Sequence, residues 1–223
     1  MKFNNLKIRT KLLLGFLAVI IVMVIVGIIG FIGLQTLGGQ LQEVTDNRLP
    51  SINALQNIRE GQTSIKASER TLLMDLLTNK EIRATQFSNI NLNWKKIDEA
   101  MNIYSPLEQT VEEKKKWDEF LPGWNEWRSL SAKFHVLLKT QDSLKNQLTL
   151  KGNNKKALAE MKTINTQILQ AGVKIAPLIT KCETELNSLI NINVSTANEL
   201  KQKADQSISF SNFLLLAVAG VGL

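Results

Sequence analysis

The most hydrophobic part of the chain is residues 12–34, a stretch of 23 positions without a charged or polar side chain. A helix of this length extends roughly 34 Å, which is enough to cross the hydrocarbon core of a bilayer. The apolar core of a cleavable signal peptide is shorter, about 7–15 residues, and a small-residue cleavage site follows it. Residues 31–35 contain no such site. The pattern therefore predicts an uncleaved transmembrane helix over 12–34.

A second apolar run begins at Phe210 and includes 11 consecutive apolar residues from Phe213 to Leu223, the last residue of the sequence. Eleven residues are too few to span a bilayer as a helix. The simplest interpretation is that the sequence ends inside a second transmembrane helix, which we predict over 210–223.

The basic residues near the first apolar segment lie on one side of it. Residues 1–11 carry four basic side chains and no acidic one, whereas the first basic residue after the segment is Arg48. Because basic flanks remain in the cytoplasm, we predict a cytoplasmic tail over 1–11 and an extracytoplasmic domain over 35–209. The chain is then expected to be a multi-pass protein of the inner (plasma) membrane, with this domain in the periplasm or outside the cell.

Between the two apolar segments, hydrophobic residues recur with the period of α-helices. Residues 37–76 place mainly leucine, isoleucine and valine at two positions of a heptad, which is the spacing of a helix packed against others. We expect this helix to continue from the membrane segment and to be kinked by Pro50. Similar patterns predict helices over 80–104, over 108–148 and from 155 into the second membrane segment.

Short turns near residues 78–79, 105–106 and 152–154 separate these helices. Four antiparallel helices joined by short turns form an up-and-down bundle. The predicted fold is therefore all-α: an up-and-down antiparallel four-helix bundle whose first and last helices are continuous with the transmembrane helices.

Composition narrows the function. The sequence has 27 Lys and Arg against 20 Asp and Glu, a formal net charge of +7, and four of the basic residues lie in the N-terminal tail. The remainder is only mildly basic, which gives no support for a nucleic-acid partner. One His and one Cys exclude a disulfide framework and a multi-thiolate metal site. Gly-rich phosphate loops and nucleophile motifs are also lacking, so we expect no enzyme activity, no metal and no cofactor.

In two segments, NLKIRTKLLLGF at 5–16 and NRLPSI at 47–52, the sequence resembles bacterial methyl-accepting chemotaxis proteins (chemoreceptors) with a four-helix-bundle sensor domain. The first segment leads into the membrane helix, and the second follows soon after that helix. Taken with the membrane spans and the bundle, the resemblance covers essentially the whole chain.

The resemblance implies a homodimeric chemotaxis receptor that detects a small solute outside the cytoplasm and passes the signal through the second membrane helix. A HAMP linker and a cytoplasmic coiled-coil hairpin would follow, and the coupling protein CheW and the kinase CheA would read that hairpin. Such sensors also precede histidine kinases and cyclases, so these outputs remain alternatives. Another alternative is an interaction module that binds a periplasmic protein. An exposed apolar patch near residues 79–82 or 148–154 would favour it, and those turns are mostly polar.

A basic stripe on the first long helix suits a small anionic ligand. The stripe consists of Arg59, Thr63, Lys66 and Arg70, which are spaced by four, three and four residues and therefore share one helix face. An arginine on this face can bind a carboxylate with two hydrogen bonds. In an antiparallel bundle, residue 180 lies level with about residue 64, so two threonines of the last helix are expected to border the same pocket. Known amino-acid chemoreceptors resemble this arrangement, with arginines contributed across a dimer interface. The alternative is a solvated basic face that neighbouring acids neutralise. The candidate ligand-binding residues are Arg59, Thr63, Lys66, Arg70, Thr180 and Thr184.

Other notable residues are expected to be structural. Arg48 falls on the apolar seam, where an unpaired charge is costly, so we expect it to pair across a dimer or to extend its charge toward water. The tryptophans at positions 94, 117, 124 and 127 favour core packing over an aromatic cage for a cation. His135 has no ligand-type partner at metal-site spacing, and Cys182 is expected to be a buried apolar group.

Overall fold

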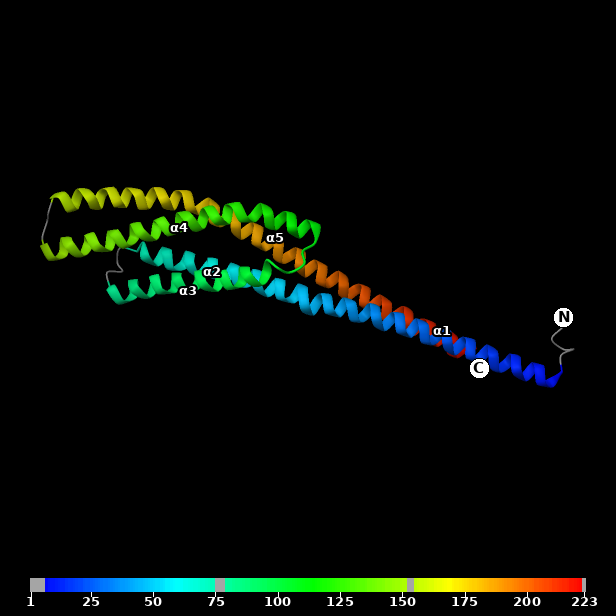
Figure 1. Cartoon of the computed structure of the whole chain (residues 1–223). Coiled ribbons are helices and arrows are strands. Elements are labelled where there is room, and N and C mark those ends of the chain that lie inside the picture. Colours follow the sequence, from blue (N-terminus) through cyan, green and yellow to red (C-terminus); the bar gives the residue numbers. More distant parts are fainter. Residues whose placement is uncertain (1–6, 75–78, 152–154, 222–223) are drawn as a thin grey trace. The chain divides into compact units, whose positions relative to one another are not determined.

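The computed structural model describes residues 7–74, 79–151 and 155–221. The elements are α1 (Ile8–Glu43), a π-helical turn η2 (Val44–Arg48), α2 (Leu49–Leu72), α3 (Lys80–Tyr104), α4 (Val111–Lys151) and α5 (Lys155–Val221), with no strand in the described ranges (Figure 1). The all-α prediction is confirmed. The predicted turn at 152–154, residue 78 of the preceding turn, and residues 1–6 and 222–223 of the terminal segments lie outside the described residues.

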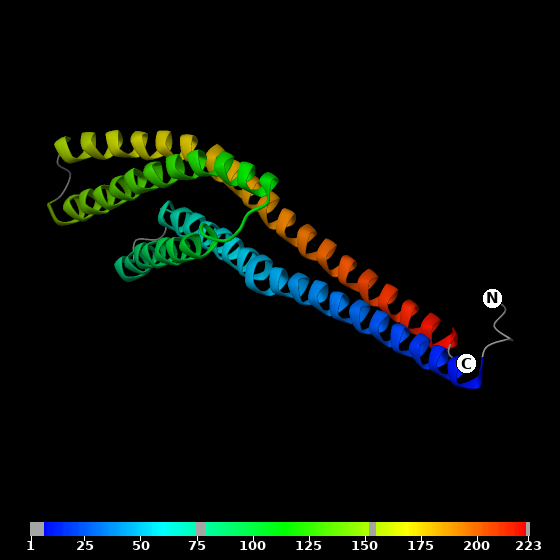
Figure 2. The same cartoon turned by 45° about the vertical axis from the view of Figure 1, so that its right-hand side comes forward.

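The chain divides into two compact units. One consists of Met1–Leu49 with Ser195–Leu223, of which residues 7–49 and 195–221 are described, and the other is Pro50–Val194. The second unit contains α2, α3, α4 and the first part of α5, which are the four helices of the predicted bundle. In it, α2 and α3 lie side by side, as do α4 and the first part of α5 (Figures 1 and 2).

Contacts between helices fix the antiparallel register of the bundle. Arg128 of α4 donates to Asp98 of α3, and Arg83 of α3 lies 2.7 Å from Asp142 of α4, so the two helices run in opposite directions. Gln62 of α2 donates to the carbonyl oxygen of Ile179 in α5 at 3.2 Å. This contact agrees with the expected level of residue 180 opposite residue 64.

An aromatic cluster from α3 and α4 forms part of the core of the bundle, beside isoleucines and leucines of all four helices. Trp117, Trp124 and Trp127 are at most 5% exposed and form successive ring contacts with Phe120 and Tyr104. Core packing of the tryptophans is therefore confirmed. These large rings bury much apolar area per residue and so supply a major part of the hydrophobic stabilisation.

A close approach of α2 and α3 occurs at Gly61. A Cβ atom at this position would lie 2.5 Å from Cγ1 and 2.8 Å from Cδ1 of Ile97, and 3.4 Å from the carbonyl oxygen of Asn93. Ile97 is fully buried. Glycine is needed here because any larger residue would push the two helices apart.

Side chains cap the starts of α3 and α4. Asn79 accepts a hydrogen bond from the backbone N–H of Ile82 at 3.0 Å. Thr110 and Glu113 form a reciprocal capping box, in which each side chain accepts from the other residue's backbone N–H at 3.1 and 3.3 Å. The predicted start of this helix at residue 108 is therefore wrong: α4 begins at Val111, directly after the capping threonine.

A single π-helical turn, η2, interrupts the long first helix just before Pro50. The backbone N–H of Leu49 donates to the carbonyl oxygen of Val44, five residues earlier. In a continuous α-helix the ring of Pro50 would clash with the carbonyl group four residues before it, and a wider turn relieves this clash. The expected kink at Pro50 is thus a local change of helix type.

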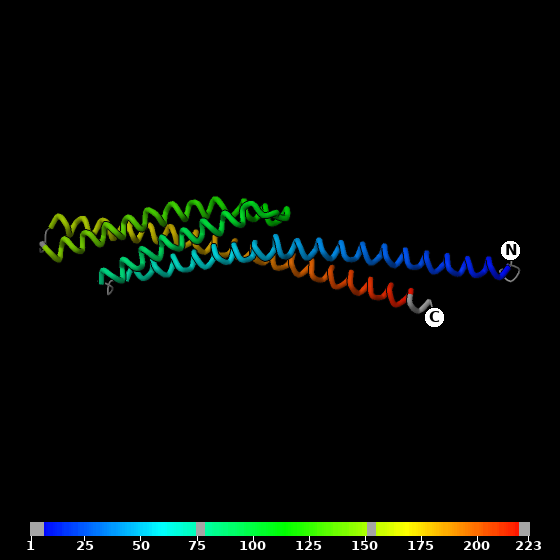
Figure 3. Tube along the Cα trace, turned by 60° about the horizontal axis from the view of Figure 1, so that its bottom comes forward, coloured from blue at the N-terminus to red at the C-terminus, as the bar shows by residue number. Residues whose placement is uncertain are grey.

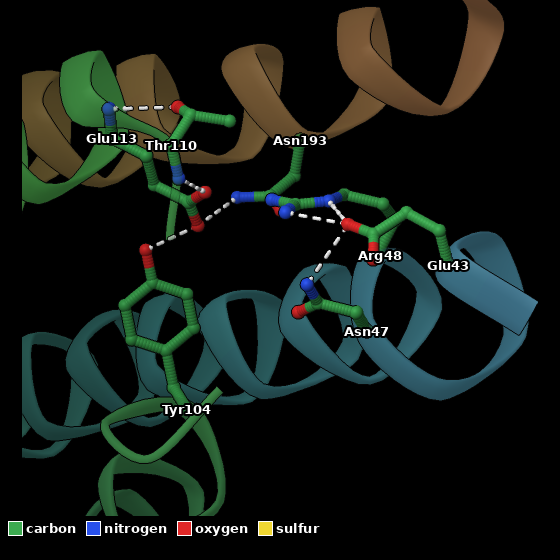
Figure 4. Close-up of polar contacts among 7 residues, drawn as sticks. All are labelled: Glu43, Asn47, Arg48, Tyr104, Thr110, Glu113 and Asn193. Atoms are coloured by element: carbon green, nitrogen blue, oxygen red, sulfur yellow. Dashed lines mark hydrogen bonds and ion pairs between the residues drawn. The ribbon is translucent and has the colours of Figure 1, made fainter. Parts of the chain in front are cut away.

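The π-helical turn also pairs Arg48 with Glu43, which is five residues away. Oε1 of Glu43 accepts from Nε of Arg48 at 2.8 Å, lies 2.7 Å from its Nη2, and accepts from Asn47 at 2.9 Å (Figure 4). The Arg48 side chain is only 3% exposed. The sequence prediction for Arg48, pairing across a dimer or extension of its charge toward water, does not include Glu43 as a partner. On an ordinary α-helix, side chains five residues apart do not face each other.

In the first unit, α1 lies beside the last part of α5 (Figure 3). A Cβ atom at Gly33 would lie 3.0 Å from Oγ of Ser211, so the two helices approach closely at that point. None of the residues of α1 is buried. Of the described helices, one continuous helical run, Ile8–Leu72, contains a stretch that is apolar and long enough to cross a membrane.

Candidate ligand-binding groove

A groove of about 600 Å³ lies between α2, α4 and α5 of the bundle. The lining residues of each helix recur with the helical period of three to four positions, so each helix presents one face to the groove. The polar lining residues are Lys66, Glu69, Arg70, Gln141 and Asn165, and the apolar ones include Leu73, Phe134, Ile168, Leu169, Val173 and Ile179. The groove is therefore an apolar trough with a few polar groups, which is typical of sites for small organic ligands.

Two of the predicted ligand residues line this groove. Nζ of Lys66 donates to Oε2 of Glu183 at 3.2 Å, which partly neutralises the ammonium group. Arg70 is exposed, and its side chain makes no hydrogen bond or ion pair with the described residues. The guanidinium of Arg70 is therefore available to an anionic ligand.

The other four predicted residues do not line the groove. Arg59 donates to Oδ1 of Asn187 at 3.0 Å. The threonine hydroxyls donate to backbone carbonyl groups one helical turn earlier and are exposed; they are Thr63, Thr180 and Thr184. The structure thus brings Lys66 and Arg70 together at one groove and leaves the remaining candidates on the helix surfaces.

A buried carboxylate on the groove wall was not predicted from the sequence. Oε1 of Glu69 accepts from the hydroxyl of Ser131 at 2.7 Å and lies 2.7 Å from Nε2 of His135. Glu69 is 5% exposed. The sequence distance of 66 residues between Glu69 and His135 explains the omission, because only the register of α2 against α4 brings them together.

A second buried carboxylate, Glu113, joins three helices of the bundle (Figure 4). Its Oε1 accepts from the hydroxyl of Tyr104 in α3 and from the side-chain amide of Asn193 in α5, both at 2.7 Å. Glu113 itself belongs to α4 and is fully buried. Charge-assisted hydrogen bonds of this kind are about twice as strong as neutral ones, so Glu113 fixes the packing of these helices.

Cys182 and Glu185 lie on the bundle part of α5. Burial raises the pKa of the Cys182 thiol to about 12. Burial also raises the pKa of Glu185 above its usual range, although Lys181, whose Nζ lies 3.8 Å from Oε1 of Glu185, acts in the opposite direction. The thiol is therefore a packed apolar group, as expected. In the part of the chain that the structure describes, no three His, Cys, Asp or Glu side chains gather in a way that could hold a metal ion.

The comparison with protein families gives one match. A family model described as a four helix bundle sensory module for signal transduction matches residues 5–208. Comparison with curated proteins and with solved structures found no significant match.

Proposed function

The chain belongs to the family of four-helix-bundle sensory modules for signal transduction, and we propose that it is the sensor portion of a transmembrane chemoreceptor that binds a small anionic solute. The bundle binds this solute outside the cytoplasm, in the groove between α2, α4 and α5. Binding changes the packing of the helices, and the change reaches a cytoplasmic output domain. This role is binding and signalling without catalysis, and it needs no cofactor.

The groove is the observation that best supports this proposal. It has a volume of about 600 Å³, which suits a small organic molecule. Lys66 and Arg70 of α2 lie on its lining and supply cationic groups for an acidic group of the solute. Of the predicted anion-binding stripe on the first helix, this proposal keeps Lys66 and Arg70.

The membrane arrangement is part of the same proposal. Residues 12–34 span the membrane once, and the apolar residues from Phe210 onward begin a second span. The exposed apolar surface of α1 supports the first span, because such a surface is stable in lipid and unfavourable in water. The sensor domain then lies in the periplasm or outside the cell, and residues 1–11 lie in the cytoplasm.

Signalling would follow from the length of α5. This helix lines the groove through Ile168, Val173 and Ile179 and runs on to Val221 without interruption. A solute that favours one packing of α5 over another shifts the population of the two states. In a homodimer, the shifted helix would act on a cytoplasmic output domain. That domain would either bind CheW and CheA or be a histidine kinase or a cyclase.

A protein partner is the second candidate function. Exposed apolar side chains near the helix ends favour it, since Leu150 is 83% exposed, Leu158 45% and Ile82 42%. In this case the bundle would bind a periplasmic protein, and the groove would not be the site of recognition.

A thermal-shift screen of the purified full chain tests the proposal. A solute at a hundred times its dissociation constant adds about 2.7 kcal/mol to the stability, which raises the melting temperature by several degrees. We expect organic acids to raise it, and Arg70→Gln and Lys66→Gln to reduce the shift. The matched control is Lys133→Gln, at an exposed position of α4 outside the groove lining. If no acid shifts the melting temperature of the folded chain, the protein-partner function is favoured.

A further inference from the structure

We infer that the ligand of the groove is an apolar monocarboxylate, bound within a single subunit with its carboxylate at Arg70 and its hydrocarbon body along α5. This inference rests on the proposed function, because it identifies the class of solute that the sensor binds. It differs from the sequence-based expectation, in which the first and last helices meet the solute across a dimer interface.

The walls of the groove are suited to a hydrocarbon body. Leu73, directly after α2, is 47% exposed, and Leu169 and Val173 of α5 are 69% and 68% exposed. The inner wall is formed by buried Phe134 of α4 and Ile168 of α5. Covering such side chains with an apolar group removes them from water, which is favourable in proportion to the area covered.

The charges along the groove leave a place for one carboxylate. Lys66 is already paired with Glu183, and Glu69 is directed to Ser131 and His135. Arg70 makes no such contact with the described residues. A single guanidinium can bind one carboxylate with two parallel hydrogen bonds, whereas a second carboxylate on the ligand would have to compete with Glu183 for Lys66.

An amino acid fits this groove less well than the same acid without the amino group. An ammonium group needs a carboxylate or several acceptors when it leaves water. Oε1 of Glu69 is occupied by Ser131 and His135 at 2.7 Å each. Of the other polar lining groups, Gln141 and Asn165 bond to each other at 2.8 Å. We expect the groove to favour the acid without an ammonium group, because Glu69, the acidic residue in its lining, is only 5% exposed and already holds Ser131 and His135.

Three probes of nearly equal size test this inference: 3-phenylpropionate, phenylalanine and 3-phenylpropan-1-ol. Binding of each is measured by equilibrium binding to the full chain in lipid nanodiscs, with empty nanodiscs subtracted. We expect 3-phenylpropionate to bind at least tenfold more tightly than either other probe. Arg70→Gln should weaken the binding of 3-phenylpropionate about tenfold and leave the binding of the alcohol unchanged, because the substitution removes the charge-assisted contact alone.

A second variant tests the apolar wall. Leu169→Ser should weaken the binding of both 3-phenylpropionate and 3-phenylpropan-1-ol severalfold, since it removes apolar contact area that both probes use. Leu169 is exposed, so the variant is expected to fold. Leu158→Ser is the matched control, because Leu158 is also an exposed leucine of α5 and does not line the groove.

Two outcomes would overturn the inference and leave the sensor function in place. One is tighter binding of phenylalanine or of succinate than of 3-phenylpropionate. The other is binding of 3-phenylpropionate that Arg59→Gln abolishes and Arg70→Gln does not, which would place the site on the surface outside the groove. If the folded chain binds no monocarboxylate, dicarboxylate or amino acid, the proposed function fails as well.

Discussion

Gly61 is a residue at which the packing of the bundle leaves no room for a side chain. A methyl group there would overlap with the buried side chain of Ile97. Alanine is better than glycine in a helix by about 1 kcal/mol, but overpacking a core costs about 1–3 kcal/mol. We therefore expect Gly61→Ala to lower the free energy of unfolding by about 1 kcal/mol, as measured by thermal unfolding of the detergent-solubilised full chain.

The control for this prediction is Gly172→Ala in α5. No atom lies within 4 Å of a Cβ atom at Gly172 apart from its own helix, so the helix preference of alanine acts alone and stability should rise by about 0.5–1 kcal/mol. Equal effects of the two substitutions would contradict the close approach of α2 and α3.

The raised pKa of Cys182 predicts a thiol that reacts slowly in the folded protein. With a pKa of about 12, roughly one thiol in ten thousand is thiolate at pH 8, compared with roughly one in four at the usual pKa of about 8.5. Alkylation by iodoacetamide should therefore be very slow in the native chain and fast in denaturant. Because unfolding releases a proton above about pH 8.5, the contribution of this group to stability should fall as the pH rises toward 12. A native thiol that reacts as fast as the denatured one would show that Cys182 is accessible.

At the scale of single residues, the sequence predicts burial better than it predicts partners. Trp117, Trp124, Trp127 and Cys182 are buried as predicted, and Trp94 is half-buried against the same core. Glu69 and Glu113, however, are acidic residues within helices, and nothing in their immediate neighbours marks them as buried. Their partners come from other helices, so they become evident only when the register between helices is known.

Among the elements, α4 has the most specific start signal. The capping box of Thr110 and Glu113 satisfies two backbone N–H groups, and replacing an N-cap threonine by alanine costs about 1 kcal/mol. We expect Thr110→Ala to lower stability by about that amount. Glu113→Ala should cost more, about 3 kcal/mol, because it also removes the buried carboxylate that accepts from Tyr104 and Asn193. Thermal unfolding of the two variants measures the difference, and equal losses would mean that Glu113 acts only as a cap.

The sequence predicts the ends of a helix well where turn residues mark them. Helix α3 has the predicted bounds of 80 and 104, because Asn79 and the Ser105-Pro106 pair limit it on both sides. The predicted start of α4 lies three residues too early, and the capping pattern from Thr110 to Glu113 marks the observed start at Val111. Pro50 signalled a break in the first helix, but a proline alone does not specify whether the chain kinks, turns or adopts a π-helical turn.

At the scale of the whole molecule, the close approach of Gly33 and Ser211 predicts that an engineered disulfide can link α1 to α5. The double variant Gly33→Cys and Ser211→Cys, made in a chain with Cys182→Ala, should form a disulfide under mild oxidation in membranes, since a Cβ at Gly33 lies 3.0 Å from Oγ of Ser211. A shift in mobility on non-reducing gels after proteolysis between the helices measures it. The control is Gly38→Cys with Ser211→Cys, because Gly38 has no atom within 4 Å of its Cβ position; equal linking of both pairs would contradict the contact.

The extra width of η2 has a consequence for how the length of this chain can vary. A deletion within an α-helix rotates everything after it by about 100°, which moves core side chains to the surface. Within Val44–Arg48, the loss of one residue such as Asp46 instead replaces the bond from Leu49 to Val44 by an ordinary α-helical one. Helical phase is then kept on both sides of the deletion. Because such a deletion restores the α-helical turn with which the ring of Pro50 would clash, relatives of this chain that are one residue shorter at this turn are expected to lack the proline.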